Sequence, residues 1–163
     1  TWDGDRDLRA VGKDTIAMLK ETYSHDYPRQ VSEICIHLQA ALSLAGTPGV
    51  REPEALDQIY CDTAAKVVAG ALYVSILHSR SLDEALIAAV NHTGDSAAVG
   101  AVTGAIVGAL VGEEGIPEFY LEGLEPVEIL RTLAEDMFQG CPMERQSRFF
   151  DCEWEEKYIA PGN

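Results

Sequence analysis

The residues best suited to chemistry in this sequence lie in the turn 91-NHTGDS-96, which holds a histidine, a carboxylate and two hydroxyls. Small apolar residues follow, so Asp95 or Ser96 could cap a helix by accepting a hydrogen bond from a free backbone amide. A carboxylate on a rigid turn is equally suited to bind a hard cation such as Mg²⁺. The turn alone leaves both interpretations open.

Other reactive residues give weaker signals. The four cysteines form no CxxC pair and have no closely spaced histidine, which argues against a zinc site. We expect reduced thiols in a cytoplasmic protein, with Cys35 and Cys61 in the core. His92 would lie at a helix C-terminus, where it either interacts with the helix dipole or contacts a ligand. The acidic stretch 3-DGDRD-7 fails as an EF-hand loop, because Leu8 occupies the glycine position.

Composition indicates a globular protein with an acidic surface. The chain has 163 residues, of which 47% are hydrophobic and 24% charged, with a net charge of −15. This charge argues against nucleic-acid binding, which requires basic side chains, and against a membrane partner. A small anionic ligand stays compatible, because backbone amides at helix N-termini bind phosphate. Since no signal peptide is apparent and the first residue is not Met, we expect a processed or partial chain.

Apolar residues recur at spacings of three and four, and alternating strand-like runs are absent, so we predict a single all-α domain of about six helices. Glu54 to His78 is predicted to form one helix that tolerates Gly70, and Ser81 with Glu84 forms a capping box for the next. The segment from 142 to 163 is expected to be a tail that lies over the domain or frays. The predicted helices span 8–23, 31–44, 54–78, 82–90, 95–112 and 126–138. The last helix is expected to turn inward Val127, Leu130, Leu133 and Phe138.

The run 97–112 carries small residues at every fourth position, on two adjacent helix ridges. Such ridges allow close helix packing, as small-xxx-small motifs do in membranes. The run is shorter than the about 20 residues of a membrane span and lacks basic or aromatic flanks. We therefore predict a buried packing helix and expect Gly104→Leu to prevent soluble folding. The ridges are Gly100, Gly104, Gly108 and Gly112, and Ala97, Ala101, Ala105 and Ala109.

Residues 85–125 combine four features in a fixed order: a helix ending in AVNH, the GDS turn, a VGAVTGA helix and an Ile-Pro segment. In this order they resemble the ADP-ribosylglycohydrolase family. The resemblance is strongest over 64–140, and residues 1–47 show no comparable match. It implies a compact multi-helix all-α domain, here a partial one, because family domains are normally longer than this chain.

The resemblance also implies chemistry, namely hydrolysis of the C1″ glycosidic bond of ADP-ribose conjugates at a magnesium-dependent site. Family members hold two magnesium ions with two acidic motifs. Asp95 matches the first aspartate of the second motif and would be a metal ligand. The ligand-binding residues would be Asn91, His92, Gly94 and Ser96.

Two substitutions interrupt this pattern. Ala97 and Ala98 stand where the second motif has a metal-bridging aspartate and a hydroxyl ligand. The family's first motif, Thr-Asp-Asp-Thr, is also absent, and 61-CDT-63 is only a fragment of it, inside a predicted helix. Alanine offers no oxygen to Mg²⁺, which needs several in near-octahedral geometry.

Three hypotheses remain open from the sequence. The chain is a hydrolase of this family, an inactive family member that serves as a ligand-binding or structural module, or a helical interaction domain with a chance similarity. The two alanines favour the second, whereas the retained Asn-His-x-Gly-Asp-Ser favours a ligand role. The expected partners are ADP-ribose or an ADP-ribosylated protein, and a further N-terminal segment that completes the domain.

Overall fold

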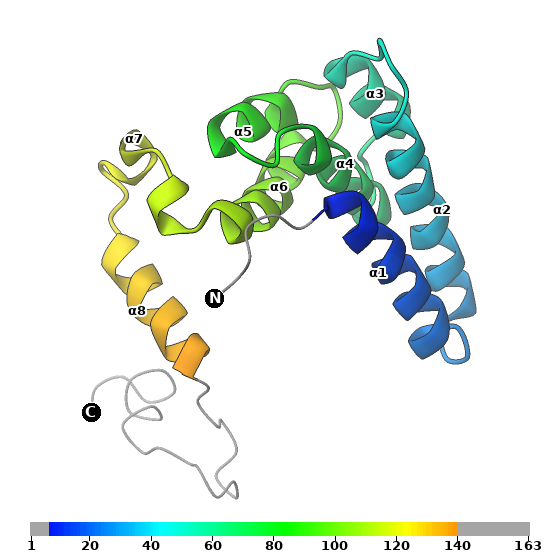
Figure 1. Cartoon of the computed structure of the whole chain (residues 1–163), viewed down its shortest axis with the longest axis horizontal. Coiled ribbons are helices and arrows are strands. Elements are labelled where there is room, and N and C mark those ends of the chain that lie inside the picture. The colour runs from blue at the N-terminus through cyan, green and yellow to red at the C-terminus, as the bar shows by residue number, and fades with distance from the viewer. Residues whose placement is uncertain (1–6, 140–163) are drawn as a thin grey trace, which may run out of the picture. The chain divides into compact units, whose positions relative to one another are not determined.

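The computed structural model describes residues 7–139, and these form α-helices with no strand (Figure 1). The all-α prediction is therefore confirmed. The chain divides into two compact units, the first ending at Glu118 and the second beginning at Phe119. The predicted tail, 142–163, lies outside the described residues. The helices are α1 (Leu8–Tyr23), α2 (Pro28–Ala45), α3 (Glu52–Ile59), α4 (Ala64–Leu77), α5 (Leu82–Val90), α6 (Ser96–Val111), α7 (Glu118–Leu121) and α8 (Val127–Gln139), with a 3₁₀ turn at Glu113–Gly115.

Helix α4 forms the centre of the first unit. It contacts α1 and α2 on one side and α5 and α6 on the other, and Figure 1 shows it running between these two pairs. Its sequence is apolar on most faces, and a helix that is hydrophobic all round is stable only when neighbours cover it. Tyr73 is accordingly 1% exposed, and Ala69, Ala71 and Val74 are fully buried.

Helices α1 and α2 form a hairpin whose ends follow ordinary capping rules. Asp7 caps α1 by accepting a hydrogen bond from the amide of Arg9 at 2.9 Å, and α2 starts at Pro28 and ends at Ala45, with Gly46 as its C-cap. The hairpin encloses a second apolar cluster that includes Cys35 at 3% exposure. Cys61 is fully buried in the main cluster, so the prediction that Cys35 and Cys61 belong to the core is confirmed.

The predicted helix 54–78 is interrupted, and this part of the prediction is wrong. Helix α3 ends at Ile59, α4 begins at Ala64, and two residues between them take positive φ, Tyr60 at 72° and Cys61 at 26°. We call this pair the elbow. Non-glycine residues seldom adopt positive φ, so side-chain type gives no warning of the break. Tertiary contacts hold it instead, because the Cys61 carbonyl accepts a hydrogen bond from the distant Asp95 amide at 3.0 Å.

Helix α6 is buried on one face, so the prediction of a buried packing helix holds only in part. Helices α4 and α5 pack against the side on which Val99, Gly100, Thr103 and Val107 are buried, whereas Ala97, Ala101, Ala105 and Ala109 are exposed. A β-carbon at Gly100 would lie 2.9 Å from Val90 Cγ1, but one at Gly104 would make only an ordinary 3.5 Å contact with Leu86. Leucine is larger than this single β-carbon, so the Gly104→Leu expectation stays a prediction. No helix within 7–139 is long and apolar enough to cross a membrane.

Gly108 offers a stability test on the same ridge. A β-carbon there would meet no atom within 4 Å. We expect Gly108→Ala to raise the free energy of unfolding by about 0.5–1 kcal/mol, because alanine loses less backbone entropy in a helix. Urea unfolding measures this change, and a loss of stability would show that this face of α6 is covered.

Helix α8 begins directly after Pro126, as predicted, but two of its expected inward residues are exposed. Phe138 is 92% and Leu130 is 51% exposed, whereas Val127 and Leu133 are half-buried. The apolar spacing produces a stripe on the helix, but burial also requires a second surface, which spacing does not supply.

Candidate functional site

The turn 91–96 joins the C-terminus of α5 to the N-terminus of α6. Ser81 caps the start of α5 by accepting a hydrogen bond from the Glu84 amide at 3.3 Å, which confirms one half of the predicted capping box. The Ser81 amide donates to the His78 carbonyl at 3.1 Å and not to the Glu84 side chain. At the other end Asn91 donates from its side-chain amide to the Ile87 carbonyl at 2.6 Å. One predicted ligand-binding group therefore also satisfies an open carbonyl at the end of a helix.

Asp95 is the N-cap of α6. Its Oδ1 accepts a hydrogen bond from the Ala98 amide at 3.0 Å, and its side chain is exposed. The capping interpretation of this residue is thus confirmed. Ser96 is the first residue of the helix, and its amide donates to the Gly94 carbonyl at 2.8 Å. The carboxylate is fixed in direction by the helix that it caps.

Gly94 lies where the turn meets the elbow. A β-carbon at this position would lie 2.9 Å from Cys61 Cβ and 3.1 Å from the Tyr60 carbonyl oxygen. The next residue, Asp95, donates its amide to the Cys61 carbonyl at 3.0 Å. Only glycine allows two backbone segments to approach this closely, so Gly94 has a packing role.

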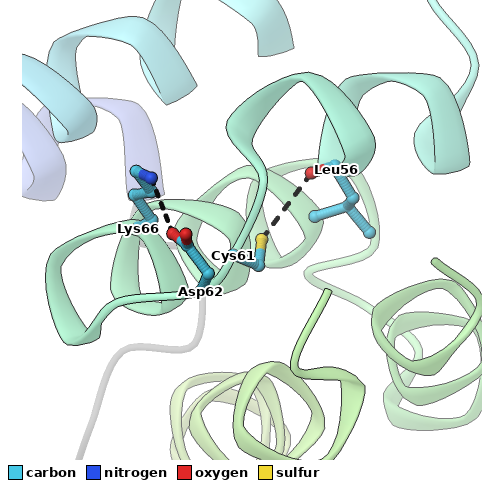
Figure 2. A network of polar contacts seen from close by, with 4 residues as sticks. All are labelled: Leu56, Cys61, Asp62 and Lys66. Carbon is cyan, nitrogen blue, oxygen red and sulfur yellow. Dashed lines mark hydrogen bonds and ion pairs between the residues drawn. The ribbon is translucent and has the colours of Figure 1, made fainter. Parts of the chain in front are cut away.

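The segment Cys61-Asp62-Thr63 belongs to the loop between α3 and α4, and its predicted place inside a helix is wrong. The Asp62 carboxylate pairs with Lys66 at 2.6 Å, and the Cys61 thiol donates to the Leu56 carbonyl at 3.8 Å (Figure 2). Burial, and then the charges of Asp62 and Asp57, raise the pKa of Cys61 to about 11. The thiol therefore stays protonated near neutral pH and packs as an apolar group.

Asp57 is a site residue that the sequence analysis missed. Its Oδ1 accepts hydrogen bonds from the Thr93 amide at 2.9 Å and from the Thr93 hydroxyl at 2.7 Å. These bonds, the amide bond first, hold the pKa of Asp57 below its usual range, and the nearby His92 lowers it further. No local pattern links the two residues, because they are 36 positions apart and belong to different loops and helices.

His92 is oriented by the turn itself. Its Nδ1 accepts a hydrogen bond from the Gly94 amide at 3.0 Å, which leaves the proton of the neutral ring on Nε2. That Nε2 is buried and has no hydrogen-bond partner within 7–139. His92 thus retains one unused donor beside Gly94.

A pocket of about 460 Å³ lies beside the elbow on the side of α2. Tyr60 lines this pocket, and its carbonyl lies against Gly94 of the turn. The Lys66 ammonium lies 5.4 Å from the centre of the Tyr60 ring, within the range of a cation–π contact. The other polar lining residues are His37, Ser43 and Gln58. The elbow therefore contacts the turn through the Tyr60 carbonyl, and Tyr60 also lines the cavity.

The oxygen atoms around Asp95 are too few to bind a pair of magnesium ions. One oxygen of Asp95 already caps α6, and Ala97 and Ala98, the two residues after Ser96, present only methyl groups. Asp57 is directed to Thr93. Within the described part of the chain no group of three or more His, Cys, Asp or Glu could hold a metal ion. Magnesium requires several oxygen ligands in near-octahedral geometry, which this turn does not supply.

Comparison with known proteins assigns the chain to a family. No curated protein and no solved structure matches the chain. The sequence model of the ADP-ribosylglycohydrolase family matches residues 2–147 of the 163. The match includes the two N-terminal helices, so it extends well beyond the stretch 64–140 in which the motifs were evident. The chain therefore belongs to the ADP-ribosylglycohydrolase family, whose name describes hydrolases, and it keeps the family's all-helical fold.

Proposed function

We propose that the chain binds ADP-ribose, free or attached to a modified protein, with the turn 91–96 as one wall of the site. The observation that carries this proposal is the fixed geometry of the turn, which is tied to α6 through Asp95 and to the elbow through Cys61. His92 Nε2 lies in the turn without a hydrogen-bond partner within 7–139. The family match over residues 2–147 and the retained Asn-His-x-Gly-Asp-Ser of the turn support ADP-ribose as the ligand.

In this proposal the chain is a binding member of its family. Ala97 and Ala98 remove oxygen ligands that the resemblance implies, so the family's route of magnesium-dependent cleavage is lost. The scaffold would retain recognition of the ligand without turnover.

The second candidate function is hydrolysis of the C1″ glycosidic bond of ADP-ribose conjugates. It is favoured by the length of the family match and by the retained Asp95. It requires a metal site that the described residues do not form. The two candidates differ in one property, turnover, and can be separated directly.

Calorimetry with ADP-ribose, with and without Mg²⁺, tests the proposal together with an assay on an ADP-ribosylated protein. We expect ADP-ribose to bind with an affinity that Mg²⁺ does not change, and no release of ADP-ribose from the protein. Magnesium-dependent release would establish the second candidate instead. Absence of ADP-ribose binding would contradict both.

A double substitution tests whether only the ligands were lost. We expect Ala97→Asp with Ala98→Thr to create Mg²⁺ binding that the parent chain lacks, because both positions lie within three residues of the fixed Asp95 and neither is fully buried. Ala101→Asp with Ala105→Thr, on the same exposed ridge but farther from the turn, is the control. Equal Mg²⁺ affinity of the two double variants would show that the turn has no special geometry for metal.

A further inference from the structure

Asp57 occupies a position that is unfavourable for its own helix. Helix α3 spans Glu52–Ile59, so Asp57 lies in its last turn, next to the negative end of the helix dipole. Glu52 and Glu54, in contrast, lie in the first turn, where carboxylates stabilise a helix. Asp57 is also exposed, so it contributes no apolar packing. Its role must therefore be sought outside α3.

The partner of Asp57 is Thr93, in the middle of the turn. A single carboxylate oxygen accepts both the Thr93 amide, at 2.9 Å, and the Thr93 hydroxyl, at 2.7 Å. The amide bond fixes the backbone of the turn, and the hydroxyl bond fixes the side-chain rotamer. Hydrogen bonds to an ionised acceptor are stronger than those between neutral groups.

Thr93 lies between His92 and Gly94. The Gly94 amide donates to the His92 imidazole at 3.0 Å, and Asp95 is the next residue after Gly94. The far side of the turn is attached to the elbow through the Cys61 carbonyl. Asp57 adds a second attachment, from α3, on the His92 side of Gly94.

We propose that Asp57 is a positioning residue that holds Thr93, and through it His92 and Gly94, in the geometry that binds the ligand. This inference rests on the proposed function, since it takes the turn 91–96 to be a wall of the ADP-ribose site. It gives a residue of α3 a role in the site, whereas the motifs of the family resemblance lie in residues 85–125. The carboxylate acts through Thr93 and does not itself contact the ligand.

The test uses the full chain and two readouts, amide hydrogen exchange at Thr93 and affinity for ADP-ribose. We expect Asp57→Ala to accelerate exchange of the Thr93 amide roughly tenfold and to weaken ADP-ribose binding by a similar factor, as the loss of one strong hydrogen bond predicts. Amides in the core of α4 should exchange at the rate of the parent chain. Asp57→Asn keeps an acceptor oxygen and should restore most of both properties.

Matched variants separate positioning from a general loss of stability. Thr93→Val removes the hydroxyl but keeps the amide, so it should have a smaller effect than Asp57→Ala. The double variant should be no worse than Asp57→Ala alone, because both changes break the same contact. Glu54→Gln, on the exposed surface of the same helix, should change neither readout.

Two outcomes would overturn the inference: parental exchange at Thr93 in Asp57→Ala, or fully additive effects of the Asp57 and Thr93 changes. If the parent chain does not bind ADP-ribose, the proposed function fails by itself. The exchange data then still decide whether Asp57 fixes the turn, so the two failures are distinguishable.

Discussion

Replacing Gly94 by alanine should lower the free energy of unfolding by about 2–4 kcal/mol, combining overpacking of about 1–3 kcal/mol with a lost backbone hydrogen bond of about 0.5–1.5 kcal/mol. The new β-carbon would lie 2.9 Å from Cys61 Cβ and 3.1 Å from the Tyr60 carbonyl oxygen. Neither atom can move by rotating a side chain. The turn must therefore separate from the elbow, which breaks the bond between the Asp95 amide and the Cys61 carbonyl.

The same substitution should abolish ADP-ribose binding in the part of the population that remains folded. Urea unfolding measures the stability change, and calorimetry below the transition measures binding. Gly108→Ala is the matched control, because its β-carbon meets no atom within 4 Å. If Gly94→Ala is as stable as the parent and binds ADP-ribose equally well, the close approach of turn and elbow has no energetic importance.

Replacing Gly70 by alanine should cost about 1–2 kcal/mol of stability, since overpacking costs about 1–3 kcal/mol and the better helix propensity of alanine returns about 0.5–1 kcal/mol. The β-carbon would lie 2.7 Å from Cys61 Sγ and 3.2 Å from Leu56 Cδ2. Both neighbours are fully buried, so they have little room to yield. Gly70 is therefore the position on α4 that accommodates the Cys61 thiol.

A second substitution tells whether the thiol is the cause. Cys61→Ala removes Sγ, so it should relieve the Gly70→Ala clash, and the double variant should be more stable than the sum of the single changes predicts. Cys61→Ala should not rescue Gly94→Ala, because there the nearest atom is Cys61 Cβ, which alanine retains. Strict additivity at the Gly70–Cys61 pair, measured by urea unfolding, would contradict this account.

Gly70 and Gly94 allow the elbow to pack closely against α4 and the turn. Gly70 makes space for the Cys61 side chain inside the core, and Gly94 brings the turn against the Tyr60–Cys61 backbone. Cys61 thus anchors the loop between α3 and α4 in the core, while its carbonyl holds the amide of Asp95. The position of the proposed site follows from the packing of one buried thiol between α3, α4 and the turn.

Helix positions were largely predictable because their signals are local. Apolar spacing located α1, α2, α5, α6 and α8, and the Ser81 cap and Pro126 marked two of their starts. The break after Ile59 was not predictable, because Tyr60 and Cys61 have no intrinsic preference for positive φ. Burial of Leu130 and Phe138 was predicted wrongly, since spacing gives the direction of a stripe and not what covers it.

Three features could be predicted from the sequence: the helical structure of residues 7–139, the helix that follows the turn 91–96, and the alanines at 97 and 98, where the family resemblance implies oxygen ligands. Each of these depends on residue identity and on contacts within a few positions. Other features are visible only once the helices are packed: the bond between Cys61 and Asp95, the bonds of Asp57 to Thr93, and the close approaches at Gly70 and Gly94. Those contacts join residues about 10 to 36 positions apart, and their geometry depends on the packing of whole helices.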